Sequence, residues 1–295
     1  MMAPMSASRP VTSILSVQSS VAYGHVGNSA ATFPLMRVGV EVWPVLTVHF
    51  SNHTGYPSWQ GPLLSPADVA AVVQGIDALG VLPECDAVLS GYQGAEEMGL
   101  TILDVVATVK ERNPRAIYCC DPVMGDVGRG MYVRPGIPEL MRDRVLPRAD
   151  VVTPNHYELD FLSGGKPTTT LEEVLAAADR LRAAGPQTVL VTSMVLPDQP
   201  GDELQMVAVD GEGAWLVRTP LLQRVFTGSG DLTCAMFLSC LLAGDDLPTA
   251  LGTTAARVFG VLEQTAAAGK GELQLVAAQD ELVAPTHRFE VERLR

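Results

Sequence analysis

The sequence is poor in basic and in aromatic residues. Its 295 residues include 20 Lys and Arg against 33 Asp and Glu, a formal net charge of -13, and only 5% are Phe, Trp or Tyr. Nucleic-acid surfaces need clustered Lys and Arg to contact phosphates, so this composition argues against unassisted nucleic-acid binding. An anionic nucleotide can still bind, provided that a metal ion and backbone amides offset its charge.

Cysteine pairs with a redox or metal-binding spacing are also missing. The five cysteines are Cys85, Cys119, Cys120, Cys234 and Cys240. An odd number of cysteines without a Cys-x-x-Cys pair is typical of reduced, buried thiols, so we expect a cytoplasmic protein without disulfides. No apolar run is long enough to span a membrane, and residues 1–10 lack the apolar segment of a signal peptide.

Two familiar phosphate-binding motifs are absent as well. Gly165-Lys166 is followed by Pro167, which excludes the P-loop pattern. The segment 125–130 has the wrong glycine order for a dinucleotide fingerprint, and we interpret it as a mobile, glycine-rich flap or an ordinary loop. His49 and His53 have a metal-ligand spacing only on a helix, and the nearby glycine and proline indicate a loop, so we expect no zinc site there.

What the chain does contain is a regular alternation of short apolar segments and longer helical stretches. The expected strands are 12–17, 42–48, 87–89, 116–120, 151–152 and 189–191, followed by an antiparallel hairpin of 206–209 with 214–217. The expected helices are 28–38, 66–79, 100–112, 138–145, 171–183, 230–242 and 247–267. This pattern predicts an α/β fold with a mostly parallel central sheet and helices on both faces. We expect a disordered tail at 1–11 and a single domain at 12–295.

Polar side chains follow several of the predicted strands. Ser19, Asp121, Thr153 and Thr192 each come at or just after a strand end. Ligands of such sheets bind outside the carboxyl ends of the strands. We therefore expect these residues to share one rim with the glycine turn that begins at Gly228.

That turn, Gly228-Ser229-Gly230-Asp231, precedes an apolar, helix-compatible stretch. The first amides of a helix have no intrahelical partner and bind anions well. An aspartate beside a bound phosphate is unfavourable unless it accepts a proton from a hydroxyl that attacks the phosphate. The alternative is an ordinary helix entry in which Asp231 serves the cap and the helix dipole.

Further segments accompany the turn, at 16–19, 24–28, 48–56, 90–92, 120–126 and 149–155. Together with it, they resemble the pyridoxal kinases, vitamin kinases of the ribokinase-like superfamily, over nearly the whole chain from Ser13. The Phe-Ser-Asn-His-Thr-Gly segment at 50–55 is specific, whereas the Asp-Pro-Val and Gly-x-Gly-Asp pieces mark only the superfamily. The resemblance implies a ribokinase-like fold and ATP-dependent phosphorylation of the 5′-hydroxyl of pyridoxal, with pyridoxine and pyridoxamine as further candidate substrates.

The resemblance also implies roles for the matched positions. Asp231 would be the general base, and the amides of Gly228, Ser229 and Gly230 would hold the transferring phosphoryl group. The substrate pocket would be formed by Ser19, Val26, His53, Thr54 and Tyr92. Phosphoryl transfer depends mainly on alignment and charge neutralisation, which these roles supply.

On the nucleotide side, the resemblance implies two sets of residues. Mg²⁺ and the phosphate waters would be organised by Asp121, Glu158 and Asp126. ATP would be contacted by Asp121, Glu158, Thr153, Asn155, Thr192 and Ser193, with Arg224, Val225, Phe226 and Thr227 near the adenosine. Some bacterial pyridoxal kinases carry lysine in place of Thr192, so we expect K⁺ or another monovalent cation to supply the missing charge. Family members are usually homodimers, and we expect one here.

We therefore expect an ATP-dependent kinase of pyridoxal, with two alternatives. Val225-Phe226 stand where sugar and nucleoside kinases usually carry Asp-Thr, which favours the vitamin-kinase branch. Within that branch the alternative is a hydroxymethylpyrimidine kinase or a broader vitamin kinase, against which the segment 50–56 argues. A non-catalytic B6-binding protein is the third possibility, and the intact Asp231, Asp121 and glycine turn argue against it.

Overall fold

The computed structural model describes residues 11–197 and 201–295. Its sheet strands are β1 (Ser13–Val21), β2 (Glu41–Phe50), β3 (Ala87–Ser90), β4 (Ile117–Cys120), β7 (Val151–Val152), β8 (Thr188–Met194), β9 (Glu203–Val209), β10 (Ala214–Pro220) and β11 (Val291–Arg293). Within the described residues they form one nine-stranded sheet in the order β11-β10-β9-β8-β7-β4-β3-β1-β2. All pairs from β2 to β8 are parallel, and β9, β10 and β11 pair antiparallel. The predicted mostly parallel sheet is confirmed.

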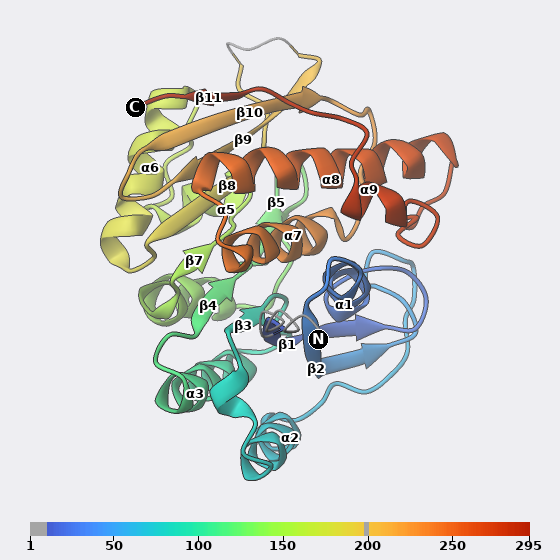
Figure 1. The fold of residues 1–295 in the computed structure, drawn as a ribbon, viewed down its shortest axis with the longest axis vertical. Helices are drawn as coiled ribbons and strands as arrows, with labels where there is room; N and C mark the ends of the chain where they lie inside the picture. The colour runs from blue at the N-terminus through green and yellow to red at the C-terminus, as the bar shows by residue number, and fades with distance from the viewer. Residues whose placement is uncertain (1–10, 198–200) are drawn as a thin grey trace, which may run out of the picture.

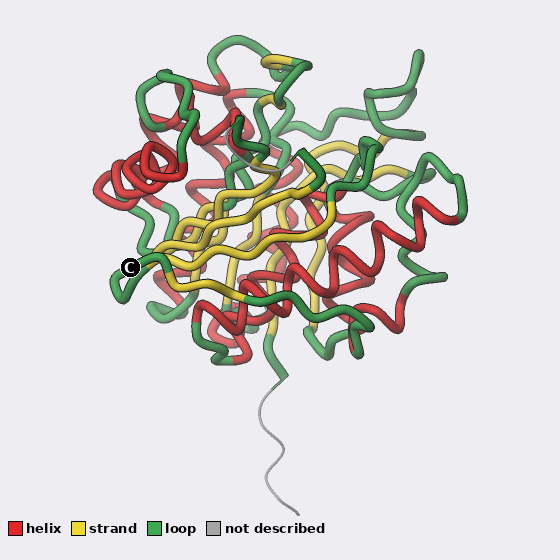
Figure 2. The backbone as a smooth tube through the Cα atoms, turned by 90° about the horizontal axis from the view of Figure 1, so that it is seen from above, coloured by secondary structure: helices red, strands yellow, loops and turns green. Residues whose placement is uncertain are grey.

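Helices cover both faces of this sheet, as predicted (Figures 1 and 2). The helices are α1 (Asn28–Arg37), α2 (Pro66–Ala78), α3 (Glu96–Arg112), α4 (Ile137–Leu140), α5 (His156–Leu162), α6 (Leu171–Ala184), α7 (Ser229–Ala243), α8 (Leu247–Ala267) and α9 (Gln279–Val283). Shorter helical turns lie at Leu82–Glu84, Met141–Val145 and Leu146–Arg148. The buried apolar side chains form two hydrophobic cores. The first core contains residues of α2 to α6, and the second contains residues of α1, α7, α8 and α9. None of the helices within the described ranges has the length and apolarity needed to cross a bilayer.

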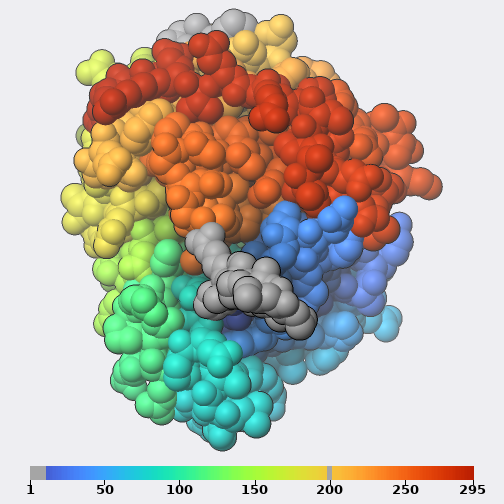
Figure 3. Space-filling model, viewed as in Figure 1, coloured from blue at the N-terminus to red at the C-terminus, as the bar shows by residue number. Residues whose placement is uncertain are grey.

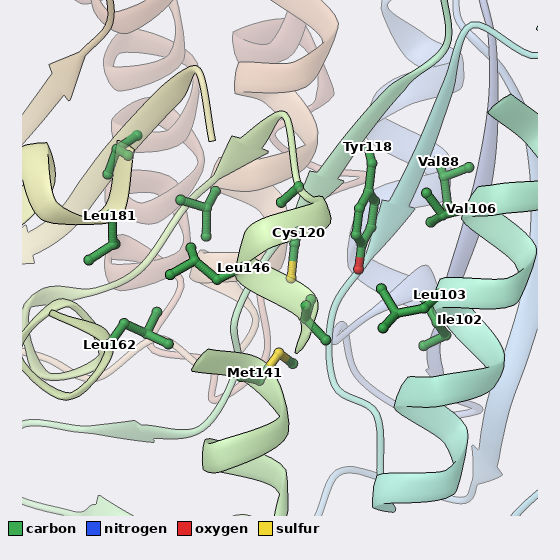
Figure 4. Packing of buried hydrophobic residues seen from close by; sticks show 14 of the residues in the cluster. Val88, Ile102, Leu103, Val106, Tyr118, Cys120, Met141, Leu146, Leu162 and Leu181 are labelled. Atoms are coloured by element: carbon green, nitrogen blue, oxygen red, sulfur yellow. The ribbon is translucent and has the colours of Figure 1, made fainter. Parts of the chain in front are cut away.

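Side chains that alternate along a strand contribute to both cores. On β4, Tyr118 and Cys120 belong to the first core, whereas Cys119 belongs to the second. Successive side chains of a strand point to opposite faces, so adjacent cysteines separate in this way. Figure 4 shows Tyr118 and Cys120 packed among aliphatic side chains that include Leu103 and Leu146. The prediction that Cys119 and Cys120 serve packing is confirmed.

Helices α2 and α8 each begin at a side-chain cap. Ser65 caps the start of α2 by accepting a hydrogen bond from the amide of Asp68, whose side chain accepts in return from the Ser65 amide. Asp246 likewise caps α8 by accepting from the amide of Thr249. Each cap satisfies amides that the helix itself leaves unpaired, typically worth about 1 kcal/mol.

Differences from the predicted elements fall in short segments. Helices α5 and α9 and strand β11 were not predicted, because each is too short to show a clear periodicity. The glycine-rich segment 125–130, predicted as a flap or loop, contains a small antiparallel hairpin of β5 (Gly125–Asp126) and β6 (Gly130–Met131). Of the predicted tail at 1–11, all but Val11 lies outside the described residues.

Candidate active site

A cavity of about 510 Å³ opens where the parallel strands end. Nearly all of the predicted site residues line it: Ser19, Val26, His53, Thr54, Tyr92, Asp121, Asp126, Thr153, Asn155, Glu158, Thr192, Ser193, Val225, Phe226, Thr227, Gly228, Ser229, Gly230 and Asp231. A volume of several hundred Å³ is typical of small-molecule sites. The fold therefore brings together residues that are far apart in sequence, as their positions at strand ends predicted.

The glycine turn lies at the start of α7. Gly228 has φ of 87°, a left-handed conformation that favours glycine. A side chain at Gly228 would also overlap the carbonyl oxygen of His25, which packs directly against it. The amide of Ser229 donates to the carbonyl of Phe226 at 3.3 Å, and its hydroxyl donates to the same oxygen at 2.8 Å. Since the Ser229 amide is partly engaged, we expect the amides of Gly228 and Gly230 to contribute more to anion binding.

Asp231 lies in the first turn of α7 and faces the cavity. Burial raises the pKa of its carboxyl group to about 6, against the lowering effect of the backbone amides of Gly27 and of Asp231 itself. A carboxylate with such a pKa is ionised at neutral pH and is a stronger base than an ordinary aspartate. Its position and its basicity both suit proton abstraction.

Asp121 follows β4 directly and, unlike the half-buried Asp231, is a buried carboxylate that is 6% exposed. The hydroxyl of Thr153 donates to its Oδ1 at 3.3 Å. Burial raises the pKa of Asp121 well above its usual range, and the neighbouring Cys234, Glu158 and Asp231 raise it further. The site thus concentrates negative charge that only partly finds hydrogen-bond donors.

Glu158 completes this acidic group. It forms a capping box with Asn155 at the start of α5, where its Oε2 accepts from the Asn155 amide at 3.0 Å. Its Oε1 accepts from the amides of Met124 at 2.8 Å and Gly125 at 3.4 Å, which ties α5 to the β5–β6 hairpin. Burial nevertheless raises the pKa of Glu158 to about 8.

These carboxylates fit a divalent cation that takes its remaining ligands from waters and phosphates. Among the residues that the structure describes, no group of three His, Cys, Asp or Glu side chains is arranged to hold a metal by itself. Asp121 and Glu158 are nonetheless buried oxygen donors whose pKa values are raised by burial and by acidic neighbours. A cation would relieve this repulsion, and Mg²⁺ characteristically binds one or two carboxylates and keeps water and phosphate ligands. Asp126 lines the same cavity from β5.

An irregularity in β8 shapes the opposite side of the cavity from β1. The pairing of β8 with β9 shifts between Val191 and Met194, and Ser193 has φ of 57°. Left-handed backbone is uncommon for serine, and such conformations cluster at functional sites. The amide of Thr192 donates to the carbonyl of Pro154 at 2.9 Å, which joins this irregular segment to the start of α5.

The cavity therefore has two sides, which follow from the strand order. Asp121, after β4, lies between the β8 segment on one side and the segments that follow β1 and β2 on the other. The β1 and β2 side is largely apolar, with Val21, Val48 and Phe50 beside the predicted substrate residues. After the roles that the sequence resemblance implies for their residues, we call these the nucleotide side and the pyridine side.

Several lining residues were not predicted from the sequence: Val21, Val48, Phe50, Gly55, Val123, Arg129 and Tyr132. Arg129 and Tyr132 lie in and beside the β5–β6 hairpin, which was expected only as a flap. Tyr132 is 49% exposed as a residue, but desolvation of its hydroxyl end and then the surrounding carboxylates, beginning with Glu158, raise its pKa. Among the described residues that line the cavity, Arg129 is the only arginine or lysine.

Arg224 is the one predicted site residue that does not line the cavity. Its guanidinium donates to the carbonyl oxygen of Lys270 and lies 6.0 Å from the centre of the Phe226 ring. Its neighbours Val225, Phe226 and Thr227 do line the cavity. A role for Arg224 near the adenosine stays a prediction.

The mostly parallel sheet, the glycine turn at α7 and the buried carboxylates beside it define a ribokinase-like phosphotransferase. A family described as phosphomethylpyrimidine kinase matches residues 69–275. The chain is 57% identical to pyridoxal kinase PdxY of Rubrobacter xylanophilus over 95% of this chain and 97% of that protein. It is 52% identical to pyridoxal kinase PdxY of Leifsonia xyli over 95% and 99% of the two chains.

Solved structures agree with these relatives. Pyridoxal kinase from Leishmania donovani in complex with ADP and pyridoxine matches with a TM-score of 0.89 and 30% identity, over 96% of this chain and 99% of that one. A putative phosphomethylpyrimidine kinase from Bacteroides thetaiotaomicron matches with a TM-score of 0.88 and 26% identity, over 98% and 100%. The chain belongs to the pyridoxal kinase family, which confirms the predicted family and the ribokinase-like fold. An ATP-dependent kinase family implies a divalent metal cofactor.

Proposed function

We propose that this protein transfers the γ-phosphoryl group of ATP to the 5′-hydroxyl of pyridoxal, giving pyridoxal 5′-phosphate and ADP. The observation that carries the proposal is the position of Asp231, a carboxylate with a pKa of about 6 at the helix start that the glycine turn forms. Membership of the pyridoxal kinase family supports the choice of substrate. Pyridoxine and pyridoxamine are proposed as further substrates.

In the proposed reaction, the Asp231 carboxylate accepts the proton of the 5′-hydroxyl as the hydroxyl oxygen attacks the γ-phosphorus. The bond between the γ-phosphorus and the β,γ-bridging oxygen breaks, and ADP leaves. The amides of Gly228 and Gly230, with that of Ser229, stabilise the charge on the transferring group. General-base assistance of this kind is typically worth about 10²–10⁴-fold in rate.

The proposed ligand contacts follow the two sides of the cavity. Ser19 and Thr54 hold polar atoms of the pyridine ring, and Val26, His53 and Tyr92 pack against it. Thr153, Asn155, Thr192 and Ser193 contact the ATP phosphates, and Val225 to Thr227 lie near the adenosine. Mg²⁺ bound with ATP would be held by Asp121 and Glu158, with Asp126 alongside, and would offset the phosphate charge.

Three further properties are part of the proposal. A monovalent cation such as K⁺ offsets charge near Thr192, where some bacterial relatives carry lysine. The protein acts as a homodimer, as is usual in the family. It works in the cytoplasm, which suits the five buried cysteines that form no disulfide within the described residues.

A hydroxymethylpyrimidine kinase is the second candidate, because the matching family is described by a phosphorylated pyrimidine. The two substrates both carry a hydroxymethyl group on a six-membered nitrogen heterocycle, so one catalytic site could serve either. The pyridine side decides between them. The specific segment at 50–55 lies there and favours pyridoxal.

A substrate comparison tests the proposal. The purified protein is incubated with ATP and Mg²⁺ and with either pyridoxal or hydroxymethylpyrimidine, and the phosphorylated products are quantified. We expect kcat/KM for pyridoxal to exceed that for the pyrimidine by at least about 100-fold, a difference of about 2.7 kcal/mol. Preference for the pyrimidine would support the second candidate, and turnover of neither would overturn both.

A further inference from the structure

A buried carboxylate outside the cavity lining joins two loops of the pyridine side. Glu272 lies in the loop after α8 and is 7% exposed. Its Oε1 accepts from the hydroxyl of Tyr56 at 2.7 Å and from Nε2 of His53 at 3.1 Å. Its Oε2 accepts from the backbone amide of His25 at 3.1 Å. Three donors from two separate loops thus converge on one carboxylate.

The hydrogen bonds of His53 determine which of its ring nitrogens carries the proton. The amide of Gly55 donates to Nδ1 of His53 at 3.1 Å, so Nδ1 carries no proton. Nε2 must then carry the proton that His53 shares with Glu272. Both ring nitrogens are therefore used within the protein. His53 can meet a substrate ring through its face or its carbon edge, while the neighbouring Thr54 retains a hydroxyl for polar contact.

Glu272 is also linked to the glycine turn at Gly228, by contacts that run through the β1–α1 loop. Gly24 has φ of 93°, and a side chain there would overlap the carboxylate of Glu272. The next residue, His25, donates its amide to Glu272, and its carbonyl oxygen packs against Gly228. Figure 3 shows the red C-terminal part of the molecule lying against the blue N-terminal part. Glu272 therefore holds the pyridine-side loop and the start of the catalytic turn in one arrangement.

We propose that Glu272 is a positioning residue for the acceptor substrate: by holding His53, Tyr56 and the His25 amide, it sets the pyridine side relative to Asp231. This inference rests on the proposed function, since it assumes that the ring of a B6 vitamer occupies the pyridine side. Glu272 itself does not line the cavity. Its loss is expected to weaken binding of the acceptor and to leave binding of ATP nearly unchanged.

Glu281, on α9, offers a matched control. It is also a buried carboxylate, 5% exposed, and it also accepts several hydrogen bonds, from the amide and hydroxyl of Thr286 and from Gln264. It does not line the cavity, and neither do its hydrogen-bond partners Thr286 and Gln264. The pair Glu272→Gln and Glu281→Gln therefore separates positioning of the substrate from general loss of a buried acceptor.

The experiment measures kcat and KM for pyridoxal and for ATP with the wild type and these two variants, together with their unfolding temperatures. Glu272→Gln is expected to raise KM for pyridoxal on the order of tenfold, as expected for one or two lost hydrogen bonds, and to change KM for ATP by less than about twofold. Glu281→Gln is expected to keep the wild-type KM for pyridoxal. Tyr56→Phe, which removes one donor, should shift KM for pyridoxal in the same direction by a smaller factor.

A wild-type KM for pyridoxal in Glu272→Gln, or an equal rise in Glu281→Gln, would overturn the inference. If Glu272→Gln does not fold, Tyr56→Phe decides, and an unchanged KM in that variant overturns it. If the wild type turns over no B6 vitamer, the proposed function fails, and calorimetric binding of pyridoxal without ATP tests the inference separately. In that case equal affinity in wild type and Glu272→Gln, or no binding at all, overturns it.

Discussion

Buried carboxylates have different surroundings in the cavity and in the loops behind the pyridine side. On the catalytic side, Asp121, Glu158 and Asp231 lie close enough for burial and acidic neighbours to raise the pKa values of Asp121 and Glu158. Behind the pyridine side, Glu272 accepts hydrogen bonds from three donors. Burying a carboxylate is costly unless donors or a cation compensate it. Glu158 also accepts from three backbone amides, so the contrast concerns Asp121, which accepts from the Thr153 hydroxyl and lies beside other acidic groups. We expect a cation to compensate Asp121, whereas hydrogen bonds within the fold compensate Glu272.

The sharpest way to test this contrast is to remove the proposed base. Asp231→Asn keeps the size of the side chain but cannot accept the hydroxyl proton, so kcat should fall by about 10²–10⁴-fold. Steady-state phosphorylation of pyridoxal measures this loss, with circular dichroism to check the fold. A variant with near-normal kcat would show that Asp231 is only a helix-capping residue.

Asp121→Asn tests whether the buried carboxylates hold Mg²⁺. The variant removes one of the two buried carboxylates proposed to hold Mg²⁺, so the Mg²⁺ concentration for half-maximal activity should rise by about tenfold or more. A titration of activity with Mg²⁺ at saturating ATP and pyridoxal measures the change. Thr153→Val, which removes the hydrogen bond to Asp121 but keeps its charge, should shift the midpoint less.

The pH dependence tests the pKa of the base directly. The pKa of Asp231 is raised from 3.8 to about 6, so the carboxylate is lost as the pH falls through 6. We expect kcat/KM for pyridoxal to fall about tenfold per pH unit below this value and to level off above it. The same profile with pyridoxine separates titration of the enzyme from titration of the substrate. A flat profile from pH 5 to 8 would contradict the assigned role.

The smallest expected effect concerns the loops around Glu272. Gly24→Ala places a methyl group against the carboxylate of Glu272 at a residue with φ of 93°. We expect a loss of about 1–3 kcal/mol in the free energy of unfolding and a rise of a few fold in KM for pyridoxal. Chemical denaturation and steady-state kinetics check the two effects. As a control, Gly80→Ala has a similar positive φ of 74° but open space around it, so only stability should change.

Much of this arrangement could be predicted from the sequence, and particular residues show where prediction stops. The strand ends and the glycine turn placed Ser19, Asp121 and Asp231 on one rim, because parallel strands share one direction. Glu272 could not be found in this way. It lies in a loop without periodicity, and its partners at 25, 53 and 56 are more than 200 positions away. Arg129 was missed for a similar reason, since hairpin geometry decides which side of a glycine-rich segment faces the cavity.

The contrast between the cavity and the loops around Glu272 is tested most directly by comparing the unfolding temperatures of wild type, Asp231→Asn and Glu272→Gln. Burial raises the pKa of Asp231 in the folded protein above its unfolded value, so its contribution to stability falls as the pH rises toward 6 and stays lost above it. Near neutral pH without nucleotide, Asp231→Asn should therefore unfold at or above the wild-type temperature. Glu272→Gln should unfold several degrees lower, because unmatched buried donors cost about 1–3 kcal/mol and each kcal/mol shifts a chain of this size by roughly 2–4 °C. An equal fall in both variants would contradict the account.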